Sequence, residues 1–197
     1  MRPLSKVYTA LIFVILYAPI AVMVLFSFNS INSTGVFAGF STYWYRELFR
    51  DGATLAALKN TLLLAVSSSL IATVIGTVAA VGIFKLKSRA AKSAIMTVTN
   101  IPIMNPDIVT GISMMLLFVF VCVRLAGAAS LSFATVLVAH ITFNLPYVIL
   151  SVMPKLRQMD RHLTEAALDL GCTPMQAFWK VELPSIMPGV VSGLIMA

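Results

Sequence analysis

The sequence predicts an all-α polytopic membrane protein, and three observations support that fold class. The 197-residue chain is 59% hydrophobic and only 11% charged, whereas a soluble domain carries about 25% charged residues. Its mean hydropathy is +0.96. Several runs reach the ~20 apolar residues that a membrane-spanning helix needs. The basic residues, which give a net charge of +7, flank these runs, so we expect them to meet a membrane surface rather than nucleic acid.

Four mostly apolar runs predict complete spans over residues 7–28, 60–84, 94–123 and 131–153 of a single transmembrane domain, 1–197. The first run is too long for the apolar part of a signal peptide, so we expect it to be retained. The third contains Pro102 and Pro106, which predict a break or kink near 102–106 because proline removes a backbone donor. The helix is expected to resume at about Pro106, with Asn105 as its cap. A fifth run, 185–197, is shorter than a crossing requires, so we expect an incomplete last span in a C-terminally truncated chain.

The distribution of basic residues predicts the orientation, since cytoplasmic segments of membrane proteins are enriched in lysine and arginine. The outer loop, 29–59, and the segment after the third span hold few of them. The N-terminus, the segment after the second span and a polar hairpin at 155–183 hold more. The richer set consists of Arg2, Lys6, Lys85, Lys87, Arg89, Lys92, Lys155, Arg157, Arg161 and Lys180. We therefore expect the N-terminus and the hairpin to be cytoplasmic.

The second span carries a face of small residues at every fourth position, namely Ser68, Ala72, Gly76 and Ala80. Small residues at this spacing let two helices approach closely in lipid. The face predicts packing either within this chain or against another subunit, and the first interpretation is favoured.

The third span contains an acidic residue, Asp107. An acid inside a span is costly and marks a functional position by default. Asp107 is expected either to line a path for a cationic substrate or to complement the positive end of a helix that starts beside it.

Aromatic residues crowd the outer loop in the stretch FSTYWYRELFRDG. One interpretation is an aromatic belt at the membrane interface. The other is a helix at the mouth of a substrate path, with Trp44 or Tyr43 facing the substrate, since aromatic faces attract amine cations.

The fourth span places His140 and Asn144 one helical turn apart. A metal site would need more ligands than these two residues offer. We therefore expect an interhelical hydrogen bond at this position.

The hairpin has the sequence EAALDLGCTPMQAFWKVELP over residues 165–184. Asp160 predicts the start of a helix that runs to Leu170, and Gly171 predicts its left-handed end. Thr173 and Gln176 form a capping box for a second helix, which is expected to stop at Pro184. Such amphipathic helices dock into a groove of a protein or lie on lipid. The balance of acids and bases favours a protein partner.

The same stretch resembles the EAA motif of ABC-importer permeases, EAA-x3-G-x9-I-x-L-P. Its matching positions are Glu165, Ala166, Ala167, Gly171, Leu183 and Pro184. Val181 stands where the motif has isoleucine. The resemblance implies the type I importer permease fold (MetI-like) and a coupling helix, including Leu170, that inserts into an ATPase subunit.

The segments SFNS, TYWYRELFRDG, NPDIVTGIS and AHITFNLPYV extend the resemblance to the permeases of spermidine/putrescine importers, the PotC type. It implies a multi-pass protein of the bacterial inner membrane, with Trp44 and Asp107 on the substrate path. It implies as partners a second permease, an ATPase dimer and an extracytoplasmic polyamine-binding protein. This chain is then no enzyme and holds no cofactor, because ATP and Mg belong to the ATPase.

Three other functions compete with polyamine import. The same kind of permease could carry ferric iron, sulfate or an amino acid, although an anion path would be lined by basic residues rather than Asp107. An ion-driven secondary transporter would need inverted repeats, and the EAA hairpin would have no role in it. A membrane enzyme is the weakest alternative, because no nucleophile, metal cluster or acid–base pair stands out.

Overall fold

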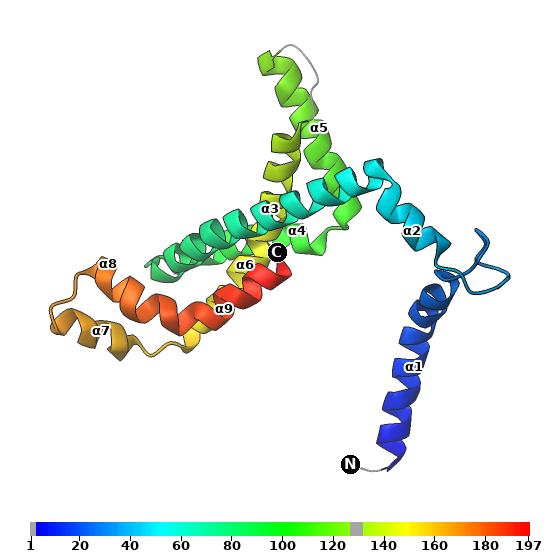
Figure 1. Cartoon of the computed structure of the whole chain (residues 1–197). Helices are drawn as coiled ribbons and strands as arrows, with labels where there is room; N and C mark the ends of the chain where they lie inside the picture. The colour runs from blue at the N-terminus through cyan, green and yellow to red at the C-terminus, as the bar shows by residue number, and fades with distance from the viewer. Residues whose placement is uncertain (1–2, 127–131) are drawn as a thin grey trace. The chain divides into compact units, whose positions relative to one another are not determined.

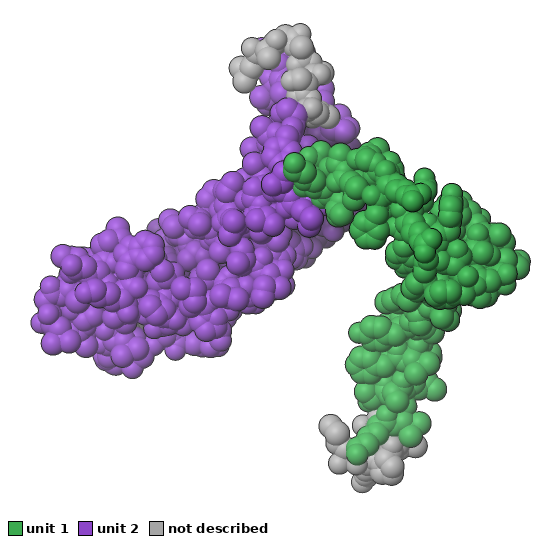
Figure 2. All heavy atoms as spheres, in the orientation of Figure 1, with its two compact units in different colours: residues 1–60 green, residues 61–197 purple. Residues whose placement is uncertain are grey.

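The computed structural model describes residues 3–126 and 132–197. Arg2 of the basic leader and the first residue of the span predicted at 131–153 therefore lie outside the described residues. Within the described ranges every regular element is a helix (Figure 1), which confirms the all-α fold class. The chain divides into two compact units, Met1–Asn60 and Thr61–Ala197 (Figure 2).

The first unit contains α1 (Pro3–Phe26), α2 (Tyr43–Arg50) and the first turns of α3 (Gly52–Lys85). Asp51 lies between α2 and α3. Its carboxylate accepts hydrogen bonds from the Thr54 hydroxyl and, at 3.1 Å, from the Ala53 N–H. These bonds, the Thr54 bond foremost, lower the pKa of Asp51. The charged carboxylate therefore caps the start of α3.

The second unit contains the rest of α3 and all the later helices. These are α4 (Arg89–Met104), α5 (Asp107–Ala126), α6 (Phe133–Gln158), α7 (Arg161–Asp169), α8 (Pro174–Ala177), the π-helix η1 (Phe178–Glu182) and α9 (Leu183–Met196). Across the two units, four described helices are long and apolar enough to cross a membrane: Lys6–Phe26, Gly52–Lys85, Asp107–Arg124 and Phe133–Gln158. They overlap the four complete spans that the sequence predicts.

The run predicted at 94–123 consists of two helices, α4 and α5, which meet within the predicted region at 102–106. Pro102 lies inside α4, and the chain breaks at Asn105–Pro106. Asn105 was expected to cap the second helix, but it ends the first, with φ −87° and ψ 144°. Its extended backbone follows from the proline after it, whose ring disfavours the helical region for the preceding residue. The Pro106 carbonyl then accepts the first hydrogen bonds of α5.

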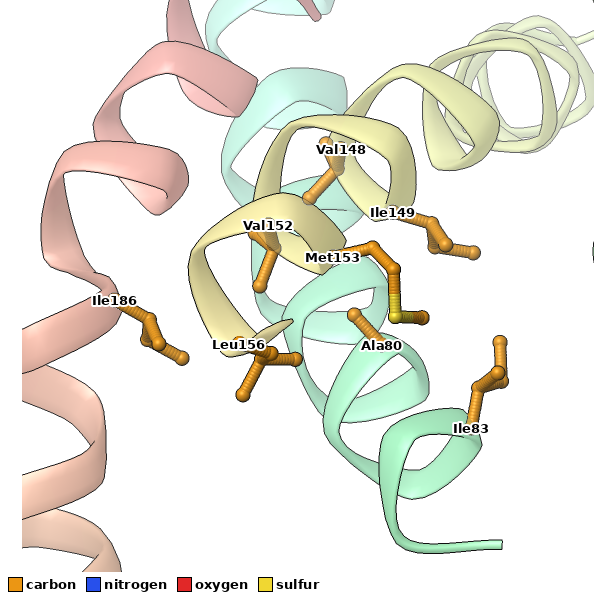
Figure 3. Close-up of a cluster of buried hydrophobic side chains, with 8 residues drawn as sticks. All are labelled: Ala80, Ile83, Val148, Ile149, Val152, Met153, Leu156 and Ile186. Atoms are coloured by element: carbon orange, nitrogen blue, oxygen red, sulfur yellow. The ribbon is translucent and has the colours of Figure 1, made fainter. Parts of the chain in front are cut away.

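The core of the second unit is formed by α6 between α3 and α9 (Figure 3). Val148, Val152 and Leu156 of α6 are fully buried. Val148 packs against a glycine on each side: a Cβ on Gly76 would lie 2.7 Å from Val148 Cγ1, and one on Gly193 would lie 3.2 Å from its Cα. Helix α6 is thus held at close range through positions that have no side chain.

The small-residue face of α3 packs within this chain. Ser68, Ala72, Gly76 and Ala80 are all buried, and Gly76 lies against Val148 of α6. This confirms the favoured interpretation, in which the small-residue face packs against helices of the same chain.

Candidate functional site: the hairpin between α6 and α9

The first arm of the hairpin is α7, which starts where the sequence predicts. The Asp160 side chain accepts a hydrogen bond from the His162 N–H at 3.0 Å, and α7 ends at Asp169 with Leu170 as its C-cap. An aspartate at this position satisfies a backbone donor that the helix itself cannot. The arm therefore begins directly after α6, which ends at Gln158.

Gly171 forms the elbow, and it has the left-handed backbone that the sequence predicts, with φ +85°. The Gly171 N–H donates to the Leu168 carbonyl at 2.9 Å, and the Cys172 N–H donates to the Ala167 carbonyl at 3.0 Å. These two bonds make a Schellman motif, which closes the end of α7. The direction in which the chain leaves α7 is thus set by backbone hydrogen bonds.

The second arm starts with the capping box that the sequence predicts. The Thr173 hydroxyl accepts from the Gln176 N–H at 3.3 Å, and the Gln176 side chain accepts from the Thr173 N–H at 3.0 Å. Pro174 occupies the first turn of α8, where its missing N–H costs nothing.

The expected stop at Pro184 is wrong, because the second arm continues into α9 through the π-helix η1. The Leu183 N–H bonds to the Phe178 carbonyl, a π-type spacing with one residue more than in an α-helix. A proline in an α-helix clashes with the carbonyl four residues before it. The wider turn directly ahead of Pro184 relieves that clash, and Pro184 lies in the first turn of α9.

The hairpin presents some of the EAA residues to solvent and buries others. Glu165, Ala166, Gly171 and Pro184 are exposed, and Leu170 is 87% exposed. Ala167 is buried, and Leu183 is half-buried against the core cluster. A continuous helix would place Leu170 on the same face as Ala167. Leu170 is exposed instead, because α7 ends at Asp169. The exposed group is free to meet a partner, while Ala167 and Leu183 hold the hairpin on its own subunit.

Glu182 is a residue of the hairpin whose burial the sequence did not indicate. Uniform α-helical spacing would place Glu182 on one face with Met175, Phe178 and Trp179. Met175 and Trp179 are 67% and 60% exposed, however, while Glu182 is 4% exposed. The π turn changes the angular position of residue 182, which separates it from the face that α-helical spacing predicts. Its carboxylate Oε2 lies 2.9 Å from Lys85 Nζ at the end of α3.

The outer loop of the first unit is organised around Asn29, which is 1% exposed. Its side-chain amide donates to the carbonyls of Ser33 and Val36, and its carbonyl oxygen accepts from the Ala38 N–H. Trp44 Nε1 donates to the Asn29 backbone carbonyl at 3.1 Å. A buried polar side chain with all these bonds made fixes the loop in one shape.

A cavity of about 400 Å³ opens beside this loop. It is lined by the end of α1, by residues of the loop and by one face of α2, including Trp44 and Tyr45. Tyr43 does not line it, but its ring contacts Trp44 edge-on at 5.2 Å. Of the two aromatic residues predicted for the substrate path, Trp44 is the one that faces a cavity.

We expect Asn29→Ala to disorder this loop, because it leaves the backbone partners of the amide without a bond, at roughly 1–3 kcal/mol. Fluorescence of Trp44, in a Trp179→Phe background, would shift to the red and become accessible to quenchers. The matched control is Asn32→Ala, because Asn32 is exposed in the same loop. Equal spectra for the two variants would contradict the role of Asn29.

Asp107 lies in the second unit, as the first residue of α5, and it is exposed. This position suits the interpretation as an acid that complements a helix N-terminus, and its exposure leaves the carboxylate accessible to a cation. His140 Nδ1 donates a hydrogen bond to the Val136 carbonyl of its own helix at 2.9 Å. The interhelical bond expected of His140 stays a prediction, which its second ring nitrogen, Nε2, would have to make. Among the described side chains, no group of three His, Cys, Asp or Glu residues could hold a metal ion.

Comparison of the sequence with known proteins shows the family to which the chain belongs. Residues 72–197 match the model of the family described as binding-protein-dependent transport system inner membrane component. The chain is 38% identical over 185 residues to the putrescine transport system permease protein PotI of Escherichia coli K12, covering 94% of this chain and 66% of PotI. It is 34% identical over 196 residues to the spermidine/putrescine permease protein PotC of the same strain, covering 100% of this chain and 72% of PotC.

PotC of Haemophilus influenzae is 32% identical over 194 residues, which is 98% of this chain and 73% of that protein. The chain thus spans about two thirds to three quarters of the length of these relatives. Its apolar helices are those of a multi-pass membrane protein. The chain belongs to the family of binding-protein-dependent transport system inner membrane components.

Proposed function

We propose that this chain is a membrane-spanning subunit of an ATP-driven importer of polyamines. The observation that carries the proposal is the hairpin at 160–182, whose exposed EAA residues surround an elbow closed by hydrogen bonds. A polar surface held in one shape between two helices of the bundle is suited to dock into another protein. The partner in this proposal is an ATPase subunit, and the hairpin is its coupling element.

The proposed mechanism is alternating access. Closure of the ATPase dimer on ATP and Mg moves the hairpin, and the hairpin moves the spans of this chain and of a second permease subunit. An extracytoplasmic binding protein delivers the substrate at the outer loop. In this arrangement the N-terminus and the hairpin lie in the cytoplasm, in line with the basic residues around them. The chain itself makes and breaks no covalent bond.

Two features support a polyamine as the cargo. PotI and PotC, by their names, are permeases of putrescine and of spermidine/putrescine systems. Asp107 and the aromatic residue Trp44 are groups that attract amine cations. Uptake of labelled putrescine by vesicles that hold the assembled transporter tests the cargo. Competition by spermidine is expected, and competition by ferric iron, sulfate or an amino acid instead would reject a polyamine.

We expect Asp107→Asn to raise the KM for polyamine uptake by about tenfold, because a charge-assisted contact contributes about 1.5–3 kcal/mol. The kcat is expected to change less, and assembly with the ATPase to survive. Asp107→Glu keeps the charge and is the matched control. An unchanged KM in Asp107→Asn would remove this residue from the substrate path and leave it the role of a helix N-terminal acid.

A further inference from the structure

Lys85 and Glu182 join two parts of the chain that are far apart in sequence. Lys85 is the last residue of α3, and Glu182 is the last residue of the π-helix η1. Lys85 Nζ lies 2.9 Å from Glu182 Oε2, with the lysine side chain 55% exposed and the glutamate side chain 5% exposed. No described donor meets hydrogen-bond geometry at this oxygen, so the contact is an ion pair.

Lys85 is the positive group that compensates the buried negative charge of Glu182, as the other groups around that carboxylate show. A cavity of about 170 Å³ beside it is lined by Phe84, Met159, Thr164, Glu165 and Glu182 itself. The apolar side chains and the second carboxylate cannot stabilise a buried anion, and the Thr164 hydroxyl makes no hydrogen bond to it. A buried charge without a partner is strongly unfavourable. Removing Lys85 is therefore expected to do more than removing an exposed ion pair, which contributes little.

The end of α3 is fixed on its other side as well. Lys92 Nζ of α4 donates to the Phe84 carbonyl at 3.3 Å and lies 5.0 Å from the centre of the Phe84 ring. The last turn of α3 thus lies between a lysine of α4 and the glutamate of the hairpin. Movement of Glu182 would be passed to α3 and α4 together.

Helices α6 and α9 need no side-chain contact to follow a movement of the hairpin, because the backbone joins both of them to it. Helix α6 ends at Gln158, just ahead of α7, and η1 runs directly into α9. Helix α3 has no covalent connection to the hairpin near Lys85. Movement of the hairpin can reach α3 indirectly, through the packing of α6 on α3, or directly, through side chains of the hairpin. Among the described residues, the Lys85–Glu182 pair is the ion pair that joins the hairpin directly to α3.

We propose that the Lys85–Glu182 ion pair is the direct link through which movement of the hairpin reaches α3. Both residues are positioning residues of the transport cycle, and neither needs to touch substrate or ATP. This inference rests on the proposed coupling function of the hairpin. It adds a pathway within the subunit, from the hairpin to a span that the chain does not connect to it.

The test uses the assembled transporter with its ATPase, second permease and binding protein, and the variants Lys85→Met, Glu182→Gln and the double variant. The first readout is polyamine uptake per ATP hydrolysed, which a purely structural role would not change. Each single variant is expected to lower this ratio by about tenfold. The double variant, which buries no charge, is expected to be no worse than Lys85→Met, since paired residues are not additive.

The second readout reports whether the hairpin stays docked. The Thr164 hydroxyl is buried in the cavity without a hydrogen-bond partner, so Thr164→Cys loses no bond and places a thiol there. In a Cys122→Ala, Cys172→Ser background, the pair variants are expected to raise maleimide labelling of this thiol at least ~5-fold, as local opening does. Lys87→Met is the matched control, because Lys87 is an exposed lysine two positions after Lys85.

Three results would overturn the link: unchanged labelling and unchanged uptake per ATP in both single variants, strictly additive effects in the double variant, or an equal loss of uptake and ATPase activity. Labelling requires no substrate. If the unmodified transporter takes up no polyamine, the proposed cargo is wrong, while labelling and substrate-independent ATPase activity still decide whether the ion pair transmits movement.

Discussion

Replacing Gly171 with valine is expected to uncouple transport from ATP hydrolysis while the spans stay folded. Space is not the obstacle, because nothing lies within 4 Å of a Cβ at this position. The backbone is the obstacle: φ is +85°, a conformation that costs a β-branched residue roughly 1–3 kcal/mol. The chain would relax by giving up the Schellman bonds, and α8 would leave α7 in another direction.

The measurement for Gly171→Val is uptake per ATP hydrolysed, together with the amount of ATPase that copurifies. We expect the ratio to fall at least ~10-fold. Gly171→Asn is the matched control, since asparagine adopts the left-handed conformation more readily than other residues, and it should retain most of the coupling. If valine and asparagine behave alike, the elbow geometry does not set the coupling.

A second large effect is expected from Gly189→Val, this time on folding. A Cβ at Gly189 would lie 2.8 Å from the Ser151 carbonyl oxygen and 2.8 Å from Lys155 Cγ. The carbonyl belongs to the backbone of α6 and cannot rotate away, so α9 must separate from α6. Overpacking of this kind costs about 1–3 kcal/mol or more, and it affects the interface that holds the hairpin's second arm on the bundle.

Thermal unfolding of the detergent-solubilised protein measures this effect, and we expect Gly189→Val to lower Tm by roughly 5 °C or more. Gly82→Val is the matched control. Gly82 is also a helical glycine, but nothing lies within 4 Å of its Cβ position, so the two variants share the same change in helix propensity. Equal Tm values for both would contradict the close approach of α9 to α6.

Short-range signals in the sequence predicted most of the hairpin. Asp160, Gly171 and the Thr173–Gln176 box each act within four residues of their own position, and the structure has all of them where the sequence places them. Such caps depend on local hydrogen bonds and backbone angles, so a single sequence is sufficient to recognise them.

The residues that were missed depend on contacts or register beyond that range. Asn29 forms bonds within an irregular loop that has no periodicity, so its burial leaves no pattern in the sequence. Glu182 is buried because a π turn changes the register and because Lys85 lies beside it. Helical spacing assumes a constant angle per residue, and that assumption fails between Phe178 and Glu182.

The π turn also fixes an angular phase between the two halves of the helix that runs from Pro174 to Met196. Each residue of an α-helix advances the chain by about 100° around the axis, and a π turn holds one residue more than an α turn. Deleting one residue between Phe178 and Glu182 would restore α geometry and preserve the continuity of the helix. Because the shorter turn still closes once around the axis, α8 and the elbow would keep nearly the same azimuth relative to α9. A deletion elsewhere in this helix, where the α geometry stays the same, would rotate them by about 100°, so the π turn lets the helix hold one more residue without turning the elbow away.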